Sequence, residues 1–298
     1  MIERIWLGLP VWNRADWAGE LLPPRTPADR RLAAYARVFN AVEGNTTFYA
    51  TPPASTVARW AEQVGPGFRF CFKLPRTVTH DRMLVNAGRD AEAFMEVLRP
   101  LQDRLGPVLV QLPPRFGPDR LPALEDFLMG LPPLASYAVE VRHPGYFSGA
   151  AASELDAMLV ELGVDRVVLD TRGVHEAVGD DEALVQAHER KPKLPAPAVA
   201  TAMRPVLRYV ANPDLPANDQ RLAQWAAQVV RWLEQGRQPH VFMHVPNDFH
   251  APRLARRFFD QLAALTHVGH LPSLVGERRP PQQVALFTGS AEDSTEGR

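Results

Sequence analysis

The stretch YAVEVR, residues 137–142, alternates apolar and charged side chains, as a β-strand with two different faces does. In an α/β barrel, one face of each strand packs against helices and the other faces the barrel interior. Val139 and Val141 suit the helix-covered face, so Glu140 and Arg142 are expected to point inward. The stretch therefore predicts a barrel strand that brings an acidic and a basic side chain into the interior.

Seven further short apolar runs alternate with longer segments of helical period, which is typical of βαβ units with right-handed crossovers. The other expected strands are residues 4–9, 40–45, 68–73, 107–112, 166–170, 206–210 and 240–245. The clear helical segments are residues 27–39, 54–65, 90–106, 121–131, 153–163, 218–236 and 251–265. We expect Ser55 or Thr51 near the start of the second helix and Ser153 to cap the fifth. This order predicts an α/β fold, a single (β/α)8 TIM-type barrel that fills the chain as one domain.

Two regions depart from this rhythm. The connection after the sixth expected strand, residues 171–204, is much longer than usual and is rich in proline and basic residues. We expect it to form an ordered lid over the barrel mouth. Residues 276–298 lose the apolar period, which predicts a flexible tail after a barrel domain at residues 1–275.

Composition limits the classes of function. The 33 Lys and Arg residues nearly cancel the 34 Asp and Glu residues, so no overall field draws the chain to nucleic acid or to an anionic membrane. The single cysteine, Cys71, excludes an internal disulfide. The first residues lack the form of a signal peptide, and no apolar run is long enough to span a bilayer. We therefore expect a cytoplasmic protein with no membrane partner.

The alternation of strand side chains gives a set of inward polar residues. Phe68, Phe70 and Phe72 suit the helix-covered face, which leaves Lys73 for the interior. By the same rule, the inward polar groups near the ends of other strands are Glu43, Asn45, Gln111, Asp170, Arg208 and His244. Active sites of α/β barrels lie at this end, although a structural ion-pair network would explain any one of these residues equally well.

The set combines cationic donors with acid and base groups, which fits an anionic ligand and proton transfer. The catalytic candidates are Glu43, Lys73, Glu140 and Asp170. A zinc or manganese site is an open alternative, with ligand types at Glu43, Glu140, Asp170, His143 and His244. His244 is explained as readily by a hydrogen-bonded core histidine. The chain has no H-E-x-x-H signature and no G-x-S-x-G elbow, and we predict no cofactor.

Longer patterns resemble a known family. The segments FNAVEGNTTFYATPPASTVARWAEQVGPGFRFCFKLPRTVTH (39–80), VLVQLPPRFGPDRLPALEDFL (108–128) and YAVEVRHPGYF (137–147) resemble the YecE-like family, also called domain of unknown function 72. The resemblance implies a TIM-type barrel and no established reaction. The family patterns fall on Val42 to Tyr49, Lys73 to Pro75, Thr79 and His80, Gln111 to Pro114, and Glu140 to Pro144. The substrate-binding candidates are Asn45, Thr47, Tyr49, His80, Gln111, Arg142, His143, Arg208 and His244.

One departure from the family pattern concerns the seventh strand. Many members have R-x-H-G there, whereas this chain has Arg208 followed by Val210 in place of the histidine. If the family performs one reaction, this branch is expected to have altered it.

The tail contains a second resemblance. Gln283, Leu286 and Phe287 match the Q-x-x-L-F pattern of peptides that bind the bacterial sliding clamp, although chance explains so short a match as well.

Three functions stay open at this point. The favoured one is an enzyme acting on a small phosphorylated or carboxylated substrate by acid/base chemistry at the barrel mouth. The second is a metal-dependent phosphodiesterase or DNA-repair nuclease, whose basic lid at Arg190, Lys191 and Lys193 meets the phosphates of nucleic acid. The third is a non-catalytic ligand-binding or adaptor protein that uses the tail peptide.

Overall fold

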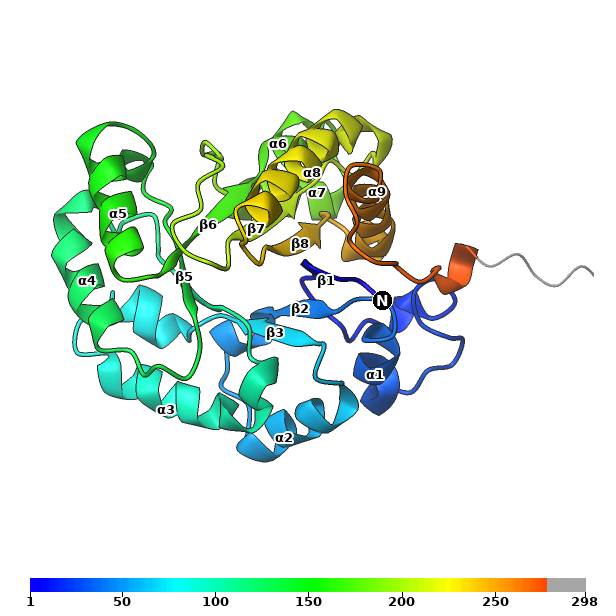
Figure 1. Cartoon of the computed structure of the whole chain (residues 1–298), viewed down its shortest axis with the longest axis horizontal. Helices are drawn as coiled ribbons and strands as arrows, with labels where there is room; N and C mark the ends of the chain where they lie inside the picture. Colours follow the sequence, from blue (N-terminus) through cyan, green and yellow to red (C-terminus); the bar gives the residue numbers. More distant parts are fainter. Residues whose placement is uncertain (278–298) are drawn as a thin grey trace, which may run out of the picture.

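The computed structural model describes residues 1–277 as a (β/α)8 barrel (Figure 1). Eight parallel strands form one sheet in the order β3-β2-β1-β8-β7-β6-β5-β4. Their bounds are β1 (Trp6–Leu9), β2 (Ala41–Gly44), β3 (Arg69–Phe72), β4 (Val108–Gln111), β5 (Tyr137–Glu140), β6 (Asp165–Asp170), β7 (Val206–Val210) and β8 (His240–His244). Each lies where the apolar runs predicted a strand, so the predicted fold class is confirmed.

Helices surround the strands, as Figure 1 shows. Their bounds are α1 (Arg31–Tyr35), α2 (Ala54–Gln63), α3 (Gly88–Leu98), α4 (Leu121–Met129), α5 (Gly149–Glu161), α6 (Arg172–Glu176), α7 (Glu182–Arg190), α8 (Asp219–Glu234) and α9 (Ala251–Ala263). Ser55 lies near the start of α2 as expected, because the helix begins at Ala54. The expected cap of the fifth helix was wrong, because α5 begins directly after Ser148 and Ser153 lies inside it. No described helix is both long and apolar enough to cross a membrane.

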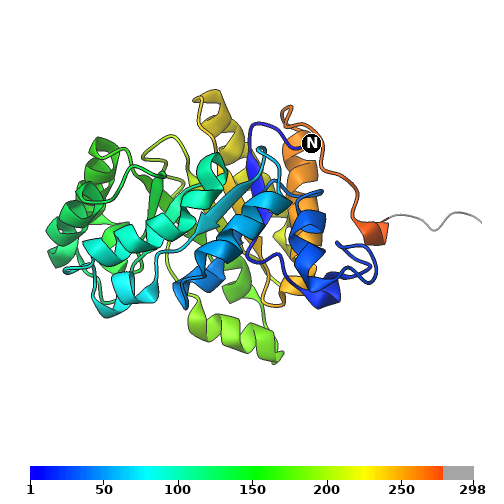
Figure 2. The ribbon, with the colours of Figure 1, turned by 90° about the horizontal axis from the view of Figure 1, so that it is seen from below.

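The long connection after β6 is not a simple loop, because it contains α6 and α7. The side chain of Asp181 caps α7 by accepting hydrogen bonds from the backbone N–H groups of Ala183 and Leu184. The Thr171 hydroxyl donates to the carbonyl of Pro192 at 2.7 Å, which ties the two ends of the excursion together. Figure 2 shows α7, in light green, standing out from one side of the barrel. This ordered segment covers part of the barrel mouth, as the lining of the cavity described below shows.

The barrel has a thin seam between β3 and β4. Only two isolated bridges join these strands in the described chain, Phe70 with Leu105 and Lys73 with Leu109. Around the second bridge, the Leu74 N–H donates to the Leu109 carbonyl at 3.0 Å. Lys73 therefore sits just beyond β3, with its backbone anchored to the neighbouring strand.

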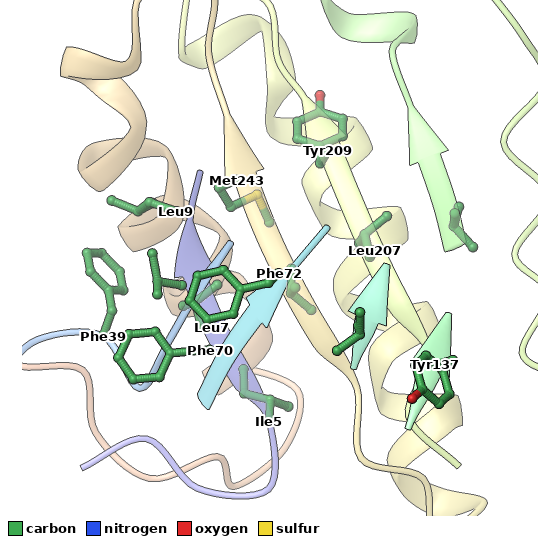
Figure 3. Packing of buried hydrophobic residues seen from close by; sticks show 14 of the residues in the cluster. Ile5, Leu7, Leu9, Phe39, Phe70, Phe72, Tyr137, Leu207, Tyr209 and Met243 are labelled. Carbon is green, nitrogen blue, oxygen red and sulfur yellow. The ribbon is translucent and has the colours of Figure 1, made fainter. Parts of the chain in front are cut away.

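The main hydrophobic core lies between the strands and the helices. Phe70 and Phe72 stack with ring centres 5.7 Å apart, and Trp60 of α2 lies 5.7 Å from Phe72. Figure 3 shows these phenylalanines beside Leu7 of β1 on the outer face of the sheet. The outward direction predicted for the phenylalanines is confirmed. Gly44 belongs to this packing, because a Cβ there would lie 2.2 Å from the ring of Phe72.

Two residues that the sequence assigned to the tail lie in the described part of the chain. Gly276 and Glu277 belong to a short 3-10 helix, and the Gly276 N–H donates to the Glu20 carbonyl at 2.9 Å. Most of the predicted tail, including Gln283, Leu286 and Phe287, lies outside the described residues.

Candidate functional site

Two layers of side chains fill the barrel interior. The first, which we call the apolar layer, consists of Ala41, Cys71, Leu109, Ala138, Val167, Val206 and Phe242. Because strand side chains alternate, the residue two positions further along faces the same interior. On six strands that next residue is polar, and these six form the polar layer: Glu43, Lys73, Gln111, Glu140, Arg208 and His244. The structure therefore brings together, near the strands' C-terminal ends, most of the polar residues that the alternation predicted.

Arg208 lies at the centre of the polar layer. Its Nε and Nη2 atoms donate to the two carboxylate oxygens of Glu43 at 2.7 and 2.8 Å, and Nη1 donates to Glu140. All three residues are almost completely buried, and the most exposed of them, Arg208, is 2% exposed. One guanidinium from β7 thus joins carboxylates from β2 and β5 across the barrel.

These contacts fix the charge state of the two glutamates. Burial alone would raise the pKa of each carboxyl, but the charges of Arg208 and Lys73 outweigh it. The net result is a pKa for Glu43 well below its ordinary value and a pKa for Glu140 of about 2. Both carboxylates are therefore ionised at neutral pH, and neither is a proton donor in this state.

Arg142 extends the network toward solvent. Its Nε donates to Glu140 at 2.8 Å, and its Nη2 donates to Oε1 of Gln111 at 3.1 Å. Arg142 follows β5 and lines the cavity at the mouth, so its guanidinium faces both the network and the cavity.

Lys73 differs from the other charged residues of the layer. Its ammonium lies 3.4 Å from Oε1 of Glu43, and the residue is 7% exposed. Burial and the nearby charge of Arg208 together outweigh the attraction of Glu43 and lower the pKa of Lys73 to about 7. Lys73 therefore exchanges its proton near neutral pH, which an ordinary lysine does not.

His244 completes the layer as a neutral side chain. Its Nε2 lies 3.3 Å from Oε2 of Glu43. Burial lowers the pKa of His244 to about 4 despite that carboxylate, so the imidazole is uncharged at neutral pH. The inward direction predicted for His244 is confirmed.

A cavity of about 570 Å³ opens above the polar layer. Four members of the layer, Lys73, Gln111, Arg208 and His244, lie at its base, and Glu43 and Glu140 do not line it. Ala183, Gln186 and Ala187 of α7, together with Arg190 and Lys191, form part of its wall. The volume is that of a small-molecule site.

The wall contains charged groups that the sequence did not assign to the favoured function. Burial, then the charge of Arg208, lowers the pKa of Lys191 to about 8. In the part of the chain that the structure describes, no carboxylate lies within 4 Å of the Lys191 ammonium. Arg76 and Asp248 also line the cavity, and burial raises the pKa of Asp248 to about 6. Lys191 had a sequence signal in the basic lid, whereas Arg76 had none.

Asp170 is a correction to the predicted site. Trp225 of α8 donates to its Oδ2 at 2.8 Å, and Arg172 pairs with the same carboxylate, so Asp170 faces the helices. The error is one of register: Val167 belongs to the apolar layer, which makes Leu169 the next inward residue of β6. Six strands, and not seven, direct a polar group into the mouth.

Two predicted substrate-binding residues also lie away from the cavity. Thr47 is fully buried, and its hydroxyl lies 2.9 Å from the Lys73 carbonyl, to which it donates, so it supports the backbone of Lys73. His143 accepts a hydrogen bond from the Gly145 N–H at 3.1 Å and contributes nothing to the cavity wall. Thr47 and His143 are close in sequence to residues that line the cavity. Sequence position alone could not distinguish cavity-lining residues from their neighbours.

The remaining candidates line the cavity. Asn45 donates to the Pro10 carbonyl at 3.1 Å, and Tyr49 is 79% exposed at the rim. The ring of Phe48 packs edge-on against both Tyr49 and His80, with centres 5.1 and 4.9 Å apart.

The geometry does not support the metal-site alternative. In residues 1–277, no group of three or more His, Cys, Asp or Glu side chains is arranged to hold a metal ion. Arg208 and Arg142 occupy the oxygens of Glu43 and Glu140, the carboxylates that the alternative required.

Together the fold and the site define a TIM-type barrel with a buried ion-pair network beneath a small-molecule cavity at its C-terminal end. The chain belongs to the DUF72 family: the family's sequence model, described as "Protein of unknown function DUF72", matches residues 6–278.

Relatives agree with this assignment, one over nearly the whole length and one over about two fifths of it. The chain is 39% identical over 285 residues to the UPF0759 protein YecE of Escherichia coli K12, covering 95% of this chain and 100% of that protein. It is 32% identical over 118 residues to the UPF0759 protein YunF of Bacillus subtilis, covering 38% of this chain and 41% of that protein.

Solved structures of the family share the fold. A DUF72 protein from Enterococcus faecalis gives a TM-score of 0.70 at 19% identity, covering 90% of this chain and 98% of that one. A DUF72 protein from Thermotoga maritima gives a TM-score of 0.68 at 22% identity, covering 87% of this chain and 99% of that one.

Proposed function

We propose that this protein is an enzyme that acts on a small phosphorylated or carboxylated substrate by acid/base chemistry in the mouth of its barrel. The observation that carries the proposal is the charge of the cavity. Its lining includes the cations Lys73, Arg76, Arg142, Arg190, Lys191 and Arg208, against the single carboxylate Asp248 among the described residues. An anion placed there gains hydrogen bonds and charge neutralisation at once.

The cations have different roles in this proposal. Arg208 is already neutralised by Glu43 and Glu140, so it serves mainly to hold the layer together. Arg142 and Lys191 face the cavity and have capacity left for a ligand, so we assign them to the substrate's acidic group.

Proton transfer is assigned to Lys73. The sequence favoured Glu43, Glu140 or Asp170 for this task, but the low pKa values of the two glutamates make them weak bases at neutral pH, and Asp170 faces the helices. A lysine with a pKa of about 7 has its proton available to give and its lone pair available to accept one at physiological pH. Glu43, 3.4 Å away, holds the amine in place.

The other two hypotheses have less support. The oxygens of the mouth glutamates are occupied by guanidinium groups, which leaves the metal-dependent nuclease without a carboxylate set in the described chain. The adaptor hypothesis rests on Gln283, Leu286 and Phe287, which lie outside the described residues.

A thermal-shift experiment tests the binding part of the proposal. Purified protein is heated with inorganic phosphate, pyrophosphate, citrate or oxalate, and with sodium chloride at equal ionic strength as the salt control. A specific anion at about 100 times its Kd stabilises the folded state by about 2.7 kcal/mol. We expect stabilisation by at least one anion beyond the salt control, and its loss in Arg142→Ala and Lys191→Met.

The matched control is Arg120→Ala, which removes an arginine outside the cavity lining and should leave the shift unchanged. If no anion stabilises the protein beyond the salt control, or if the mouth variants respond as fully as the wild type, the proposal is wrong.

A further inference from the structure

We propose that Lys73 forms a Schiff base with its substrate, so that the substrate is a small aldehyde or ketone carrying a carboxylate or phosphate group. This inference rests on the function proposed above and specifies its substrate class. The argument has four steps, which concern the choice of lysine, its placement, its charge state and the balance of the reaction.

The first step is composition. The sequence contains 30 arginines and only three lysines, Lys73, Lys191 and Lys193. Where a cation alone is needed, this chain uses arginine, as Arg208 and Arg142 illustrate in the same layer. Arginine stays protonated and is not a nucleophile, whereas a lysine amine can lose its proton and attack carbon. A lysine in the middle of an arginine network therefore points to chemistry that arginine cannot perform.

The second step is placement. The backbone of Lys73 is fixed on both sides, by the Thr47 hydroxyl on its carbonyl and by the bridge to Leu109. Its amine reaches the base of the cavity and makes no hydrogen bond shorter than its 3.4 Å contact with Glu43 among the described residues. An amine that is rigidly placed, buried and still open to the cavity can meet a bound carbonyl carbon in one orientation.

The third step is the charge state. Schiff-base formation needs the neutral amine, and burial together with Arg208 brings the pKa of Lys73 to about 7. A substantial fraction is neutral at physiological pH, as in lysines that act as nucleophiles elsewhere in proteins.

The fourth step is the balance of atoms and charge. The amine lone pair forms a bond to the carbonyl carbon, and the carbonyl oxygen takes up the proton that the nitrogen releases, which gives a carbinolamine. That hydroxyl takes up one proton from solvent and leaves as water while the C=N bond forms, which gives the protonated Schiff base and consumes no oxidant or reductant. The protonated Schiff base carries one positive charge at the position of the former ammonium, where Glu43 stabilises it. The network around Arg208 therefore has the same net charge with the protonated Schiff base as with the protonated amine of Lys73.

The neighbouring cations select the rest of the substrate. Arg142 and Lys191 line the same cavity as Lys73, so a carbonyl compound with an acidic group is held while its carbonyl carbon meets the amine. A neutral ketone lacks that anchor and should react much more slowly.

Reductive trapping tests the inference. The full chain is incubated with pyruvate, 2-oxoglutarate, glyceraldehyde 3-phosphate or dihydroxyacetone phosphate in the presence of sodium cyanoborohydride, with acetone as the neutral probe. Peptide mass spectrometry then locates any adduct whose mass gain equals the carbonyl compound less water plus two hydrogens. Exposed Lys193 is the internal control, because it reports the reactivity of an ordinary lysine in the same chain.

We expect an adduct on Lys73 that forms at least tenfold faster than on Lys193, that is weak with acetone, and that is absent in Lys73→Arg. The rate should rise with pH through about 7, where Lys73 loses its proton. Lys191→Met should slow the adduct on Lys73 without abolishing it, which separates the anchor from the nucleophile, and Arg120→Ala, outside the cavity lining, should leave the rate unchanged.

The outcomes distinguish this inference from the proposed function. If anions stabilise the wild type and Lys73→Arg by thermal shift but no probe labels Lys73, the Schiff base is rejected and the proposed function stands. Labelling of Lys73 at the rate of Lys193, or equally fast labelling by acetone, also rejects it. If no anion stabilises the protein, and the anionic probes label Lys73 no faster than acetone does, both proposals fail.

Discussion

The two layers inside the barrel come from the same strands and differ by only two residues of chain. The apolar layer holds small and branched side chains with Phe242, and it closes the barrel interior. The polar layer above it holds two carboxylates, a guanidinium and an amine in nearly complete burial. The difference shows that six strands each stabilise the fold at one inward position and support the site at the next.

The two layers differ in what they contribute to stability. Burial of apolar surface stabilises the barrel directly. A buried ion-pair network pays a desolvation cost that its attraction only roughly offsets, so replacing it by apolar residues is often neutral or stabilising. Keeping Glu43, Glu140 and Arg208 in this chain is therefore better explained by the site than by the stability of the fold.

The largest effect is expected from removing the centre of the polar layer. Arg208→Met leaves two buried carboxylates without their shared cation, and the free energy of unfolding should fall by about 3–5 kcal/mol. Urea denaturation at neutral pH measures it. Because the pairing lowers both pKa values, the contribution is present above the ordinary carboxyl pKa of 4.5 and is lost as pH falls through the folded values. The deficit of the variant should therefore shrink on acidification.

The matched control for that variant is Arg166→Met. Arg166 is also buried on a strand, but its partner Asp156, 2.6 Å away, is partly exposed and stays hydrated when the arginine is removed. If Arg166→Met lowers the free energy of unfolding as much as Arg208→Met does, the loss in Arg208→Met does not come from leaving buried carboxylates unpaired.

The apolar layer should respond differently. Leu109→Ala removes buried methyl groups and leaves a cavity, which costs about 2–5 kcal/mol of unfolding free energy. The anion-dependent thermal shift should persist, because no cavity-lining group is changed. Urea denaturation together with the anion titration measures both; loss of anion binding in the folded variant would contradict the separation of the two layers.

The sequence predicted the fold more completely than the site. All eight strands could be located because apolar runs and alternation are local properties of the chain. The inward set was largely right for the same reason, and it failed at Asp170, where a shift of one residue reverses the face. Arg76 lies at the start of the short π-helix Thr77–Asp81 after β3, where no periodicity assigns direction, and the pairing partners of Arg208 depend on strands far apart in sequence. Those features follow from barrel closure, which local patterns do not encode.

The third effect concerns the charge of Lys73. Its folded pKa of about 7 lies below the ordinary 10.5, so the unfolded chain binds the extra proton between these values and the unfolding free energy rises with pH across that window. The slope from Lys73 is on the order of 1 kcal/mol per pH unit, and it should be lost in Lys73→Met between pH 7 and pH 8, below the window in which Lys191, with its pKa of about 8, adds a slope of the same sign. Denaturation midpoints from pH 7 to pH 8 measure it, with exposed Lys193→Met as the control variant. A slope in Lys73→Met equal to that of the wild type over this range would contradict the low pKa of Lys73.

The smallest effect separates two histidines that the sequence treated alike. His80 lines the cavity, and burial followed by the charge of Arg142 lowers its pKa to about 4, so it faces a ligand as a neutral side chain. His143 instead accepts a hydrogen bond from Gly145 outside the cavity. Losing one neutral hydrogen bond to the ligand costs about 1 kcal/mol, so His80→Ala should weaken anion binding roughly fivefold. His143→Ala should leave the affinity within about twofold. Titration calorimetry with the most stabilising anion compares the affinities of the two variants. An equal loss of affinity in both would contradict the placement of the ligand beside His80 and away from His143.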